Sequence, residues 1–184
     1  MRISENRKLA YAVLVLCVVI SIFALGGSAM VRARSQALDV FEAGTDPSLS
    51  IRHSMDAYLD SAADAAKLMV SEAELYQGAS DLSNSISDLA DQVRGNEDMD
   101  ARYDAYSQLK TEVDRLYNAM YNPQDNSGFA NFKLAYDDFW GYDNMIRYDE
   151  YHAMARAYNA LTEGFPGKMV AALLGQEKLN AFGG

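Results

Sequence analysis

The stretch from Leu9 to Leu25, LAYAVLVLCVVISIFAL, decides how the rest of this 184-residue chain is organised. It contains no charged residue, and its polar side chains are few: Tyr11, Cys17 and Ser21. At ~1.5 Å per residue a helix over residues 9–29 is about 30 Å long, which matches the hydrocarbon layer of a bilayer. The surface helix of a globular protein has a polar face, and this stretch has none. The sequence therefore predicts a transmembrane helix over residues 9–29.

Basic residues flank this segment on both sides, and they are Arg2, Arg7, Lys8, Arg32 and Arg34. Three of them lie in residues 1–8, which we interpret as a basic N-terminal tail. Because Lys and Arg concentrate on the cytoplasmic side of a membrane, the slight excess before the segment favours an inside N-terminus. The remainder of the chain is then expected outside the membrane.

A cleaved signal peptide is the competing interpretation of the same region. The start is basic, and the small residues Gly27 and Ala29 precede a candidate cleavage point after Ala29. Against cleavage, the apolar run is long for a signal peptide and no helix breaker follows Gly27. Residues 30–46 continue the helical pattern as a stalk, so we favour an uncleaved signal-anchor. Cys17 follows Leu16 rather than a small residue, which argues against a lipidated cysteine.

The rest of the chain is acidic and long enough for one domain with a hydrophobic core. The formal net charge of the chain is −10 and its isoelectric point is about 4.6. An acidic surface repels phosphate backbones, so no nucleic-acid partner is expected. Cys17, the only cysteine, lies in the apolar segment, and residues 47–184 can therefore form no internal disulfide.

Four apolar stripes with helical spacing predict four long helices beyond the stalk. The predicted ranges are 47–77, 80–94, 97–121 and 129–163. The first range begins with Asp46 as an N-cap and Pro47 in the first turn. Gly141 marks a candidate bend in the range 129–163. Short loops join the stripes and no strand pattern competes. The sequence therefore predicts an all-α protein, in which a transmembrane helix precedes an antiparallel up-and-down bundle of about four helices.

The segment YHAMARAYNALTEGFPGKMVAALLG, residues 151–175, carries aromatic residues seven positions apart: Tyr151, Tyr158 and Phe165. Residues at this spacing share one helix face. Asn159 is suited to bonding an exposed backbone group at a neighbouring helix end. Phe165 and Pro166 predict a turn that folds residues 169–174 over the open end of the bundle. We interpret the segment as a structural lock, with a tyrosine-lined binding groove as the alternative.

This segment resembles the C-terminal motif of the LemA family, which are bacterial membrane-anchored helical proteins. The matching residues are Tyr151, Tyr158, Asn159, Phe165, Pro166, Ala171, Leu173 and Gly175. His152 stands where the family has asparagine, and MDAYLDSAADAAKLMVSE replaces the family's signature in the first helix. The resemblance implies an N-terminal transmembrane helix carrying an antiparallel bundle, here residues 47–184. It brings no established activity, but some relatives take part in building magnetosomes, so membrane scaffolding is expected by analogy.

No residue pattern in the chain predicts catalysis or a bound cofactor. Asp149 and His152 form a weak candidate metal pair that would need a further ligand from another helix. Di-iron bundles use Glu-x-x-His motifs, and neither His53 nor His152 has a glutamate three residues earlier. The oxygen-rich loop at residues 122–128 lacks the spacing of a calcium loop.

These observations predict a non-enzymatic interaction or scaffolding module, anchored by a single pass in the bacterial cell membrane. Its expected partners are the membrane itself and unknown envelope proteins. Self-association is a further expectation, because tethering in a plane raises the effective concentration of the bundle. One alternative is a ligand sensor with a pocket among Trp140, Tyr148, Tyr151 and Tyr158. A metal-binding enzyme centred on His152 is a less favoured alternative.

Overall fold

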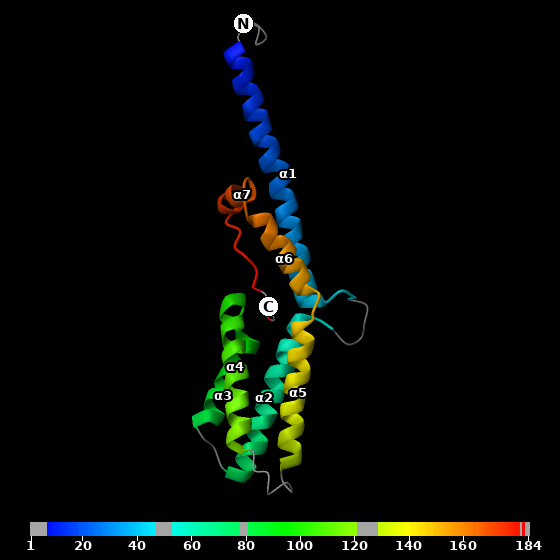
Figure 1. Ribbon diagram of the computed structural model, residues 1–184, viewed down its shortest axis with the longest axis vertical. Helices are drawn as coiled ribbons and strands as arrows, with labels where there is room; N and C mark the ends of the chain where they lie inside the picture. Colours follow the sequence, from blue (N-terminus) through cyan, green and yellow to red (C-terminus); the bar gives the residue numbers. More distant parts are fainter. Residues whose placement is uncertain (1–6, 47–52, 78–80, 121–128, 181, 183–184) are drawn as a thin grey trace. The chain divides into compact units, whose positions relative to one another are not determined.

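The computed structural model describes residues 7–46, 53–77, 81–120, 129–180 and 182. Within these ranges the regular structure is entirely helical, which confirms the predicted all-α class (Figure 1). The helices are α1 (Arg7–Ala43), α2 (Met55–Gln77), α3 (Asp81–Gly95), α4 (Met99–Met120), α5 (Phe129–Arg147), α6 (Tyr151–Thr162) and α7 (Gly167–Leu174).

The chain divides into two compact units. The first comprises Met1–Leu38 and Ala153–Leu179, and it contains most of α1 together with most of α6 and α7. The second comprises Asp39–His152 and Asn180–Gly184, and it contains α2, α3, α4 and α5.

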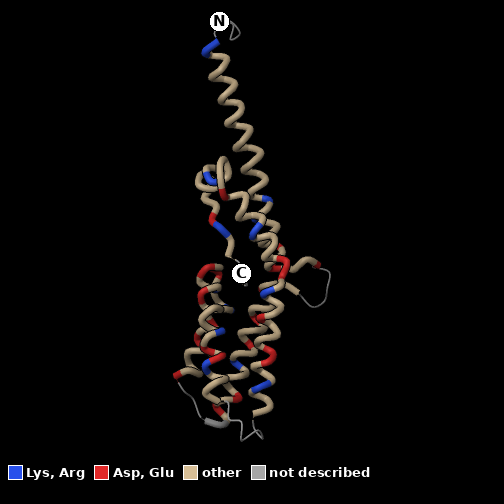
Figure 2. The backbone as a smooth tube through the Cα atoms, in the orientation of Figure 1, with Lys and Arg blue, Asp and Glu red and all other residues tan. Residues whose placement is uncertain are grey.

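Helix α1 runs for 37 residues without interruption, through the predicted transmembrane segment and most of the predicted stalk. Its most apolar 18-residue window has a mean hydropathy of 2.7, and none of that window is buried against the protein. Figure 2 shows this uncharged stretch with basic residues at both of its ends. Among the described residues, α1 is the only helix that is long and apolar enough to cross a membrane.

Gly44 ends α1 for a steric reason. Its φ angle is +75°, a left-handed conformation that side chains rarely adopt, and its N–H donates to the carbonyl of Val40 at 2.9 Å. A Cβ atom at this position would lie 2.3 Å from the carbonyl oxygen of His53. The chain can therefore pass this closely after α1 only because residue 44 is glycine.

Helices α2 to α5 form the bundle, in which α2 packs against α3 and α5, and α3 packs against α4. The apolar stripes of the sequence form its core. Fully or almost fully buried residues include Leu59, Ala62, Ala66, Met69, Ile86, Val93, Leu109, Val113, Phe132, Phe139 and Ile146. Each large side chain among them stabilises the fold by about 1.5–3 kcal/mol relative to an exposed one.

Polar caps set the starts of α2 and α4. The N–H of Ala57 donates to Ser54 Oγ at 3.2 Å, so α2 begins at Met55 with Ser54 as its cap. The N–H of Asp100 donates to Asp98 Oδ1 at 2.8 Å at the start of α4. The predicted start of the first bundle helix at Asp46 differs from this boundary, and residues 47–52 lie outside the described residues.

The predicted single helix over residues 129–163 is wrong, because the chain breaks between Arg147 and Tyr151. Asp149 caps a new helix there, since its Oδ1 accepts the N–H of Tyr151 at 2.8 Å. The carbonyl of Ile146, which would accept the next bond of a continuous helix, lies 2.6 Å from His152 Nε2. Gly141 lies inside α5 and does not mark the break.

Candidate functional site

Two neighbouring residues of α6 hold the chain segment that follows α7. The hydroxyl of Tyr158 donates to the carbonyl of Glu177 at 2.9 Å. Asn159 Nδ2 donates to the carbonyl of Leu179 at 2.8 Å, and the N–H of Leu179 donates back to Asn159 Oδ1 at 2.9 Å. The side-chain amide of Asn159 therefore bonds both the N–H and the carbonyl of Leu179. We call residues 176–180 the C-terminal strap.

Tyr151, the first tyrosine of the motif, bonds the last residue of the C-terminal strap within the second unit. Its hydroxyl donates to the carbonyl of Asn180 at 2.9 Å, and its ring packs edge-on against Phe41 with centroids 5.1 Å apart. Phe182 lies 5.8 Å from Phe41 and 5.5 Å from Tyr103, centroid to centroid. Phe182 is therefore part of an aromatic cluster in this unit.

The other motif residues surround α7. Pro166 is the N-cap residue of α7 and follows a cis peptide bond, Ala171 is buried, and Gly175 ends the helix with a φ angle of 61°. Phe165 is 82% exposed. The motif residues around α7 therefore differ in burial: Ala171 is buried and Phe165 is exposed.

Residues 169–174 are only partly buried within the first unit. Val170 is buried, but Met169, Leu173 and Leu174 are 51%, 70% and 45% exposed. A Cβ atom on Gly27 of α1 would lie 3.3 Å from Leu174 Cδ1 and 3.8 Å from Val170 Cγ1. Helix α7 therefore packs on α1 through one face and leaves another face uncovered.

A buried carboxylate links α4 and α5 inside the bundle. Asp143 is 3% exposed, and its Oδ1 accepts the Tyr106 hydroxyl at 2.8 Å and lies 3.0 Å from Lys110 Nζ. Its Oδ2 accepts from Arg147 Nη2 at 2.9 Å. Burial raises the pKa of Tyr106, and the Asp143 charge raises it further. Each oxygen of Asp143 is satisfied, which is the condition for keeping a charge in a core.

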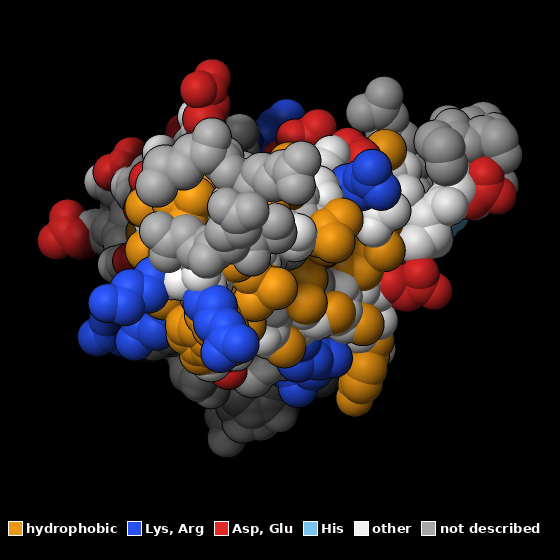
Figure 3. Space-filling model, turned by 90° about the horizontal axis from the view of Figure 1, so that it is seen from above, with side chains coloured by type: hydrophobic (Ala, Val, Ile, Leu, Met, Phe, Trp, Pro, Cys, Tyr) orange, Lys and Arg blue, Asp and Glu red, His pale blue; other side chains and the backbone are white. Residues whose placement is uncertain are grey.

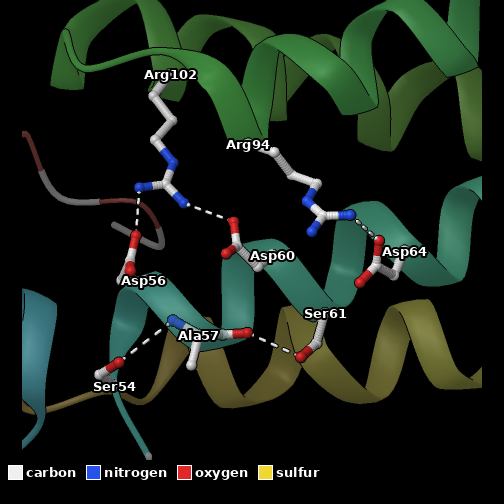
Figure 4. Close-up of polar contacts among 8 residues, drawn as sticks. All are labelled: Ser54, Asp56, Ala57, Asp60, Ser61, Asp64, Arg94 and Arg102. Atoms are coloured by element: carbon white, nitrogen blue, oxygen red, sulfur yellow. Dashed lines mark hydrogen bonds and ion pairs between the residues drawn. The ribbon is translucent and has the colours of Figure 1, made fainter.

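A second charged cluster connects α2 with the start of α4 (Figure 4). Arg102 is 7% exposed and donates to Asp56 at 2.6 Å and to Asp60 at 3.1 Å. Its guanidinium carbon lies 5.7 Å from the ring centroid of Phe41, a cation–π distance. Burial raises the pKa of Asp60, and Arg102 opposes that rise. Figure 4 also shows Arg94, which pairs with Asp64 one helical turn further along α2.

The candidate metal pair Asp149 and His152 has structural roles in the break before α6. Asp149 is the cap of α6, and burial raises its pKa while the N–H of Tyr151 lowers it. Since a carbonyl oxygen can only accept, His152 Nε2 carries the proton in its contact with Ile146. Across the described part of the chain, no group of three or more His, Cys, Asp or Glu side chains is arranged to hold a metal ion.

The four rings that the sequence nominated for a tyrosine pocket are divided between the units, with Tyr158 in the first and the other three in the second. Tyr151 and Tyr158 are fully buried, and their hydroxyls are committed to backbone carbonyls. Tyr148 is 77% exposed, and Trp140 is half-buried next to Phe139. The two motif tyrosines therefore present no free ring face to a ligand.

Sequence reasoning missed the C-terminal strap and both buried charge clusters. The strap has no helical periodicity, and its partners bond its backbone rather than its side chains. Asn159 was the sequence feature that pointed to the strap, because an asparagine next to a buried aromatic residue needs a polar partner. Arg102 and Asp143 resemble the other charged residues of a helix surface, so only the packing distinguishes them.

The described residues define the class of protein: an all-α chain with a helical bundle and, among its described helices, one that is long and apolar enough to cross a membrane. No family model, curated protein or solved structure matches it. What the protein does must therefore be argued from its own residues.

Proposed function

We propose that this protein is a single-pass membrane-anchored helical bundle that acts as an interaction or scaffolding module and not as an enzyme. The observation that carries the proposal is α1, whose apolar window contains no residue that is buried within the protein. Apolar surface of this extent is rare on soluble monomers, because each Å² left in water costs about 25 cal/mol. A bilayer would cover it along the whole length of the segment.

The polar groups of the bundle support a non-enzymatic role. Asp143 and Arg102 are the buried charged side chains of α4 and α5, and each is held by partners within the protein. A catalytic acid or base needs access to a substrate, and these groups have none. Their contacts stabilise the arrangement of helices, which is what a rigid docking module requires.

We place the N-terminus in the cytoplasm and the bundle outside, at the bacterial cell envelope. Three basic residues precede the apolar segment of α1 and two follow it closely, and this slight excess supports the orientation. Membership in the LemA family is part of the same proposal, and it rests on residues 151–175. The scaffolding role is proposed by analogy with that family. It also agrees with the buried charged groups of the bundle, which are bonded to partners within the protein.

The exposed apolar side chains of the bundle are the natural contact points for a partner. Leu75 of α2 and Leu134 of α5 are 75% and 60% exposed. A photo-crosslinking amino acid at either position should capture specific envelope proteins, or a second copy of the chain, in intact cells. The matched control places the same amino acid at Asp91, a charged and exposed position of α3.

Mass spectrometry of the crosslinked bands provides the readout. We expect the same few partners from Leu75 and Leu134, and their loss when residues 1–30 are deleted. If both positions yield only the background seen at Asp91, the bundle does not act by contact and the proposal is wrong.

A further inference from the structure

The surface formed by α7 and the turn before it is apolar and open. We call Phe165, Met169 and Leu173 the α7 face, and these side chains are 82%, 51% and 70% exposed. Large apolar side chains gathered in this way mark an interaction surface rather than chance exposure. Val170 and Ala171 lie on the opposite side of α7 and are buried, so one side of the helix packs on the protein and the other is exposed.

The place where α7 rests on α1 indicates what covers the α7 face. Val170 and Leu174 lie against Gly27, in the last turn of the predicted transmembrane segment 9–29. The first charged residues of α1 after this segment are Arg32 and Arg34. Helix α7 therefore lies beside the end of the transmembrane segment, one to two turns before the basic residues that mark the headgroup region of a bilayer.

The charge on α7 fits the same surroundings. Lys168 is its one charged residue, and it is exposed beside the apolar side chains. A lysine on such a helix keeps its ammonium group at the headgroups while its stem lies along lipid. Figure 3, a view onto the N-terminal end of α1, shows exposed hydrophobic side chains with several Lys and Arg side chains among them. Basic residues beside apolar ones are the usual pattern of a helix in the interface plane.

We propose that α7 and Phe165 insert into the lipid–water interface beside the transmembrane helix, as a second membrane contact of the same chain. The inference rests on the proposed function, because it requires α1 to span the bilayer. The occupant of the α7 face is then lipid: acyl chains near the glycerol level around Phe165 and Leu173, and headgroup oxygens around Lys168. The contact would hold the C-terminal end of α6 at the membrane surface.

An environment-sensitive fluorophore on single cysteines tests this directly in the full-length chain. The background is Cys17→Ala, and the reporter is Leu173→Cys. Leu14→Cys on the exposed apolar side of α1 reports whether the anchor is in the membrane, and Asp137→Cys on α5 is the aqueous control. Each protein is reconstituted in vesicles of phosphatidylcholine with a minority of phosphatidylglycerol, with or without brominated lipid as a contact quencher.

We expect brominated lipid to quench the fluorophores at Leu173 and Leu14 to a similar degree and to leave the one at Asp137 unchanged. Quenching at Leu14 alone overturns the inference and leaves the proposed anchoring intact. A blue-shifted but unquenched signal at Leu173 also overturns it, because the α7 face is then covered by protein, such as a second copy. If Leu14 is not quenched, the anchoring proposal fails and the inference fails with it. Quenching at all three positions would show non-specific adsorption and contradict the inference.

Discussion

The bundle and the α6–α7 region satisfy their polar groups in different ways. In the bundle, buried charges pair with other side chains across helices, as Asp143 does with Lys110 and Arg147. In α6, Tyr158 and Asn159 bond the backbone of a segment that has no regular structure. The first arrangement fixes helices to one another, and the second fixes a strap to one helix.

The two regions also differ in how they treat apolar residues. The bundle buries its stripes almost completely, whereas α1 and α7 leave large apolar side chains exposed. A region that buries its apolar surface can be stable in water, and one that does not requires another medium. This difference supports the proposal that the chain is built for two solvents, water around the bundle and lipid around α1. The following predictions test it, beginning with the largest expected effect.

Removing the buried carboxylate should damage the bundle most. Asp143→Ala leaves Tyr106, Lys110 and Arg147 without their common partner, and breaking a buried ion pair costs about 3 kcal/mol or more. Urea unfolding of the detergent-solubilised full chain, followed by circular dichroism, should show this loss. The control is Asp137→Ala, which removes a solvent-exposed pair with Lys133 and should cost less than about 0.5 kcal/mol. Equal effects of the two substitutions would contradict the account of Asp143.

Arg102 and Arg94 provide a sharper version of the same test within the second unit. The Arg102 side chain is 9% exposed and that of Arg94 is 45% exposed, although both bond aspartates of α2. Arg102→Ala should cost about 2 kcal/mol, because Asp56 and Asp60 lose a buried donor and Phe41 loses its cation. Arg94→Ala should cost about 0.5 kcal/mol or less. A larger loss at Arg94 than at Arg102, measured in the same urea titration, would reverse the expected order.

The strap should respond locally rather than globally. Asn159→Ala removes both bonds to Leu179, and we expect the Leu179 amide to exchange with solvent about tenfold faster, equivalent to about 1.4 kcal/mol. Lys178→Ala is the control, because it removes only an exposed pair with Glu163. Hydrogen–deuterium exchange should show a change at the strap and none in α2 to α5. Unchanged exchange at Leu179 would mean that Asn159 does not hold the strap.

Alkaline pH should weaken the bundle gradually. Burial, together with the hydrogen bond to Asp114, raises the pKa of Tyr136 from 10.0 to about 12. The unfolded chain therefore releases this proton at lower pH than the folded chain does, so stability falls as pH rises from about 10 to about 12. Tyr136→Phe should flatten this decline while lowering stability at neutral pH by about 1 kcal/mol. Urea midpoints measured across that pH range would contradict the assignment if the substitution left the slope unchanged.

Sequence periodicity predicted the bundle because packing in a bundle is a property of whole helices. The stripes ending at Ile146 and beginning at Tyr151 look continuous, so the break at residues 148–150 was missed. A single cap, Asp149, and the His152 contact outweigh the helical pattern there. The strap could not be predicted because its bonds use backbone atoms, which every residue supplies. The exposure of the α7 face likewise depends on contacts with α1 that local sequence does not specify.

The most direct test of the central claim is where the full-length protein fractionates. Membranes from cells producing the intact chain are washed with alkaline carbonate and separated by ultracentrifugation, and a chain lacking residues 1–30 is treated in parallel. The account predicts that the intact chain stays in the membrane pellet and the shortened chain leaves it, because the proposed anchor is α1. An intact chain, shown by mass spectrometry to retain its N-terminus, that appears in the supernatant would contradict it.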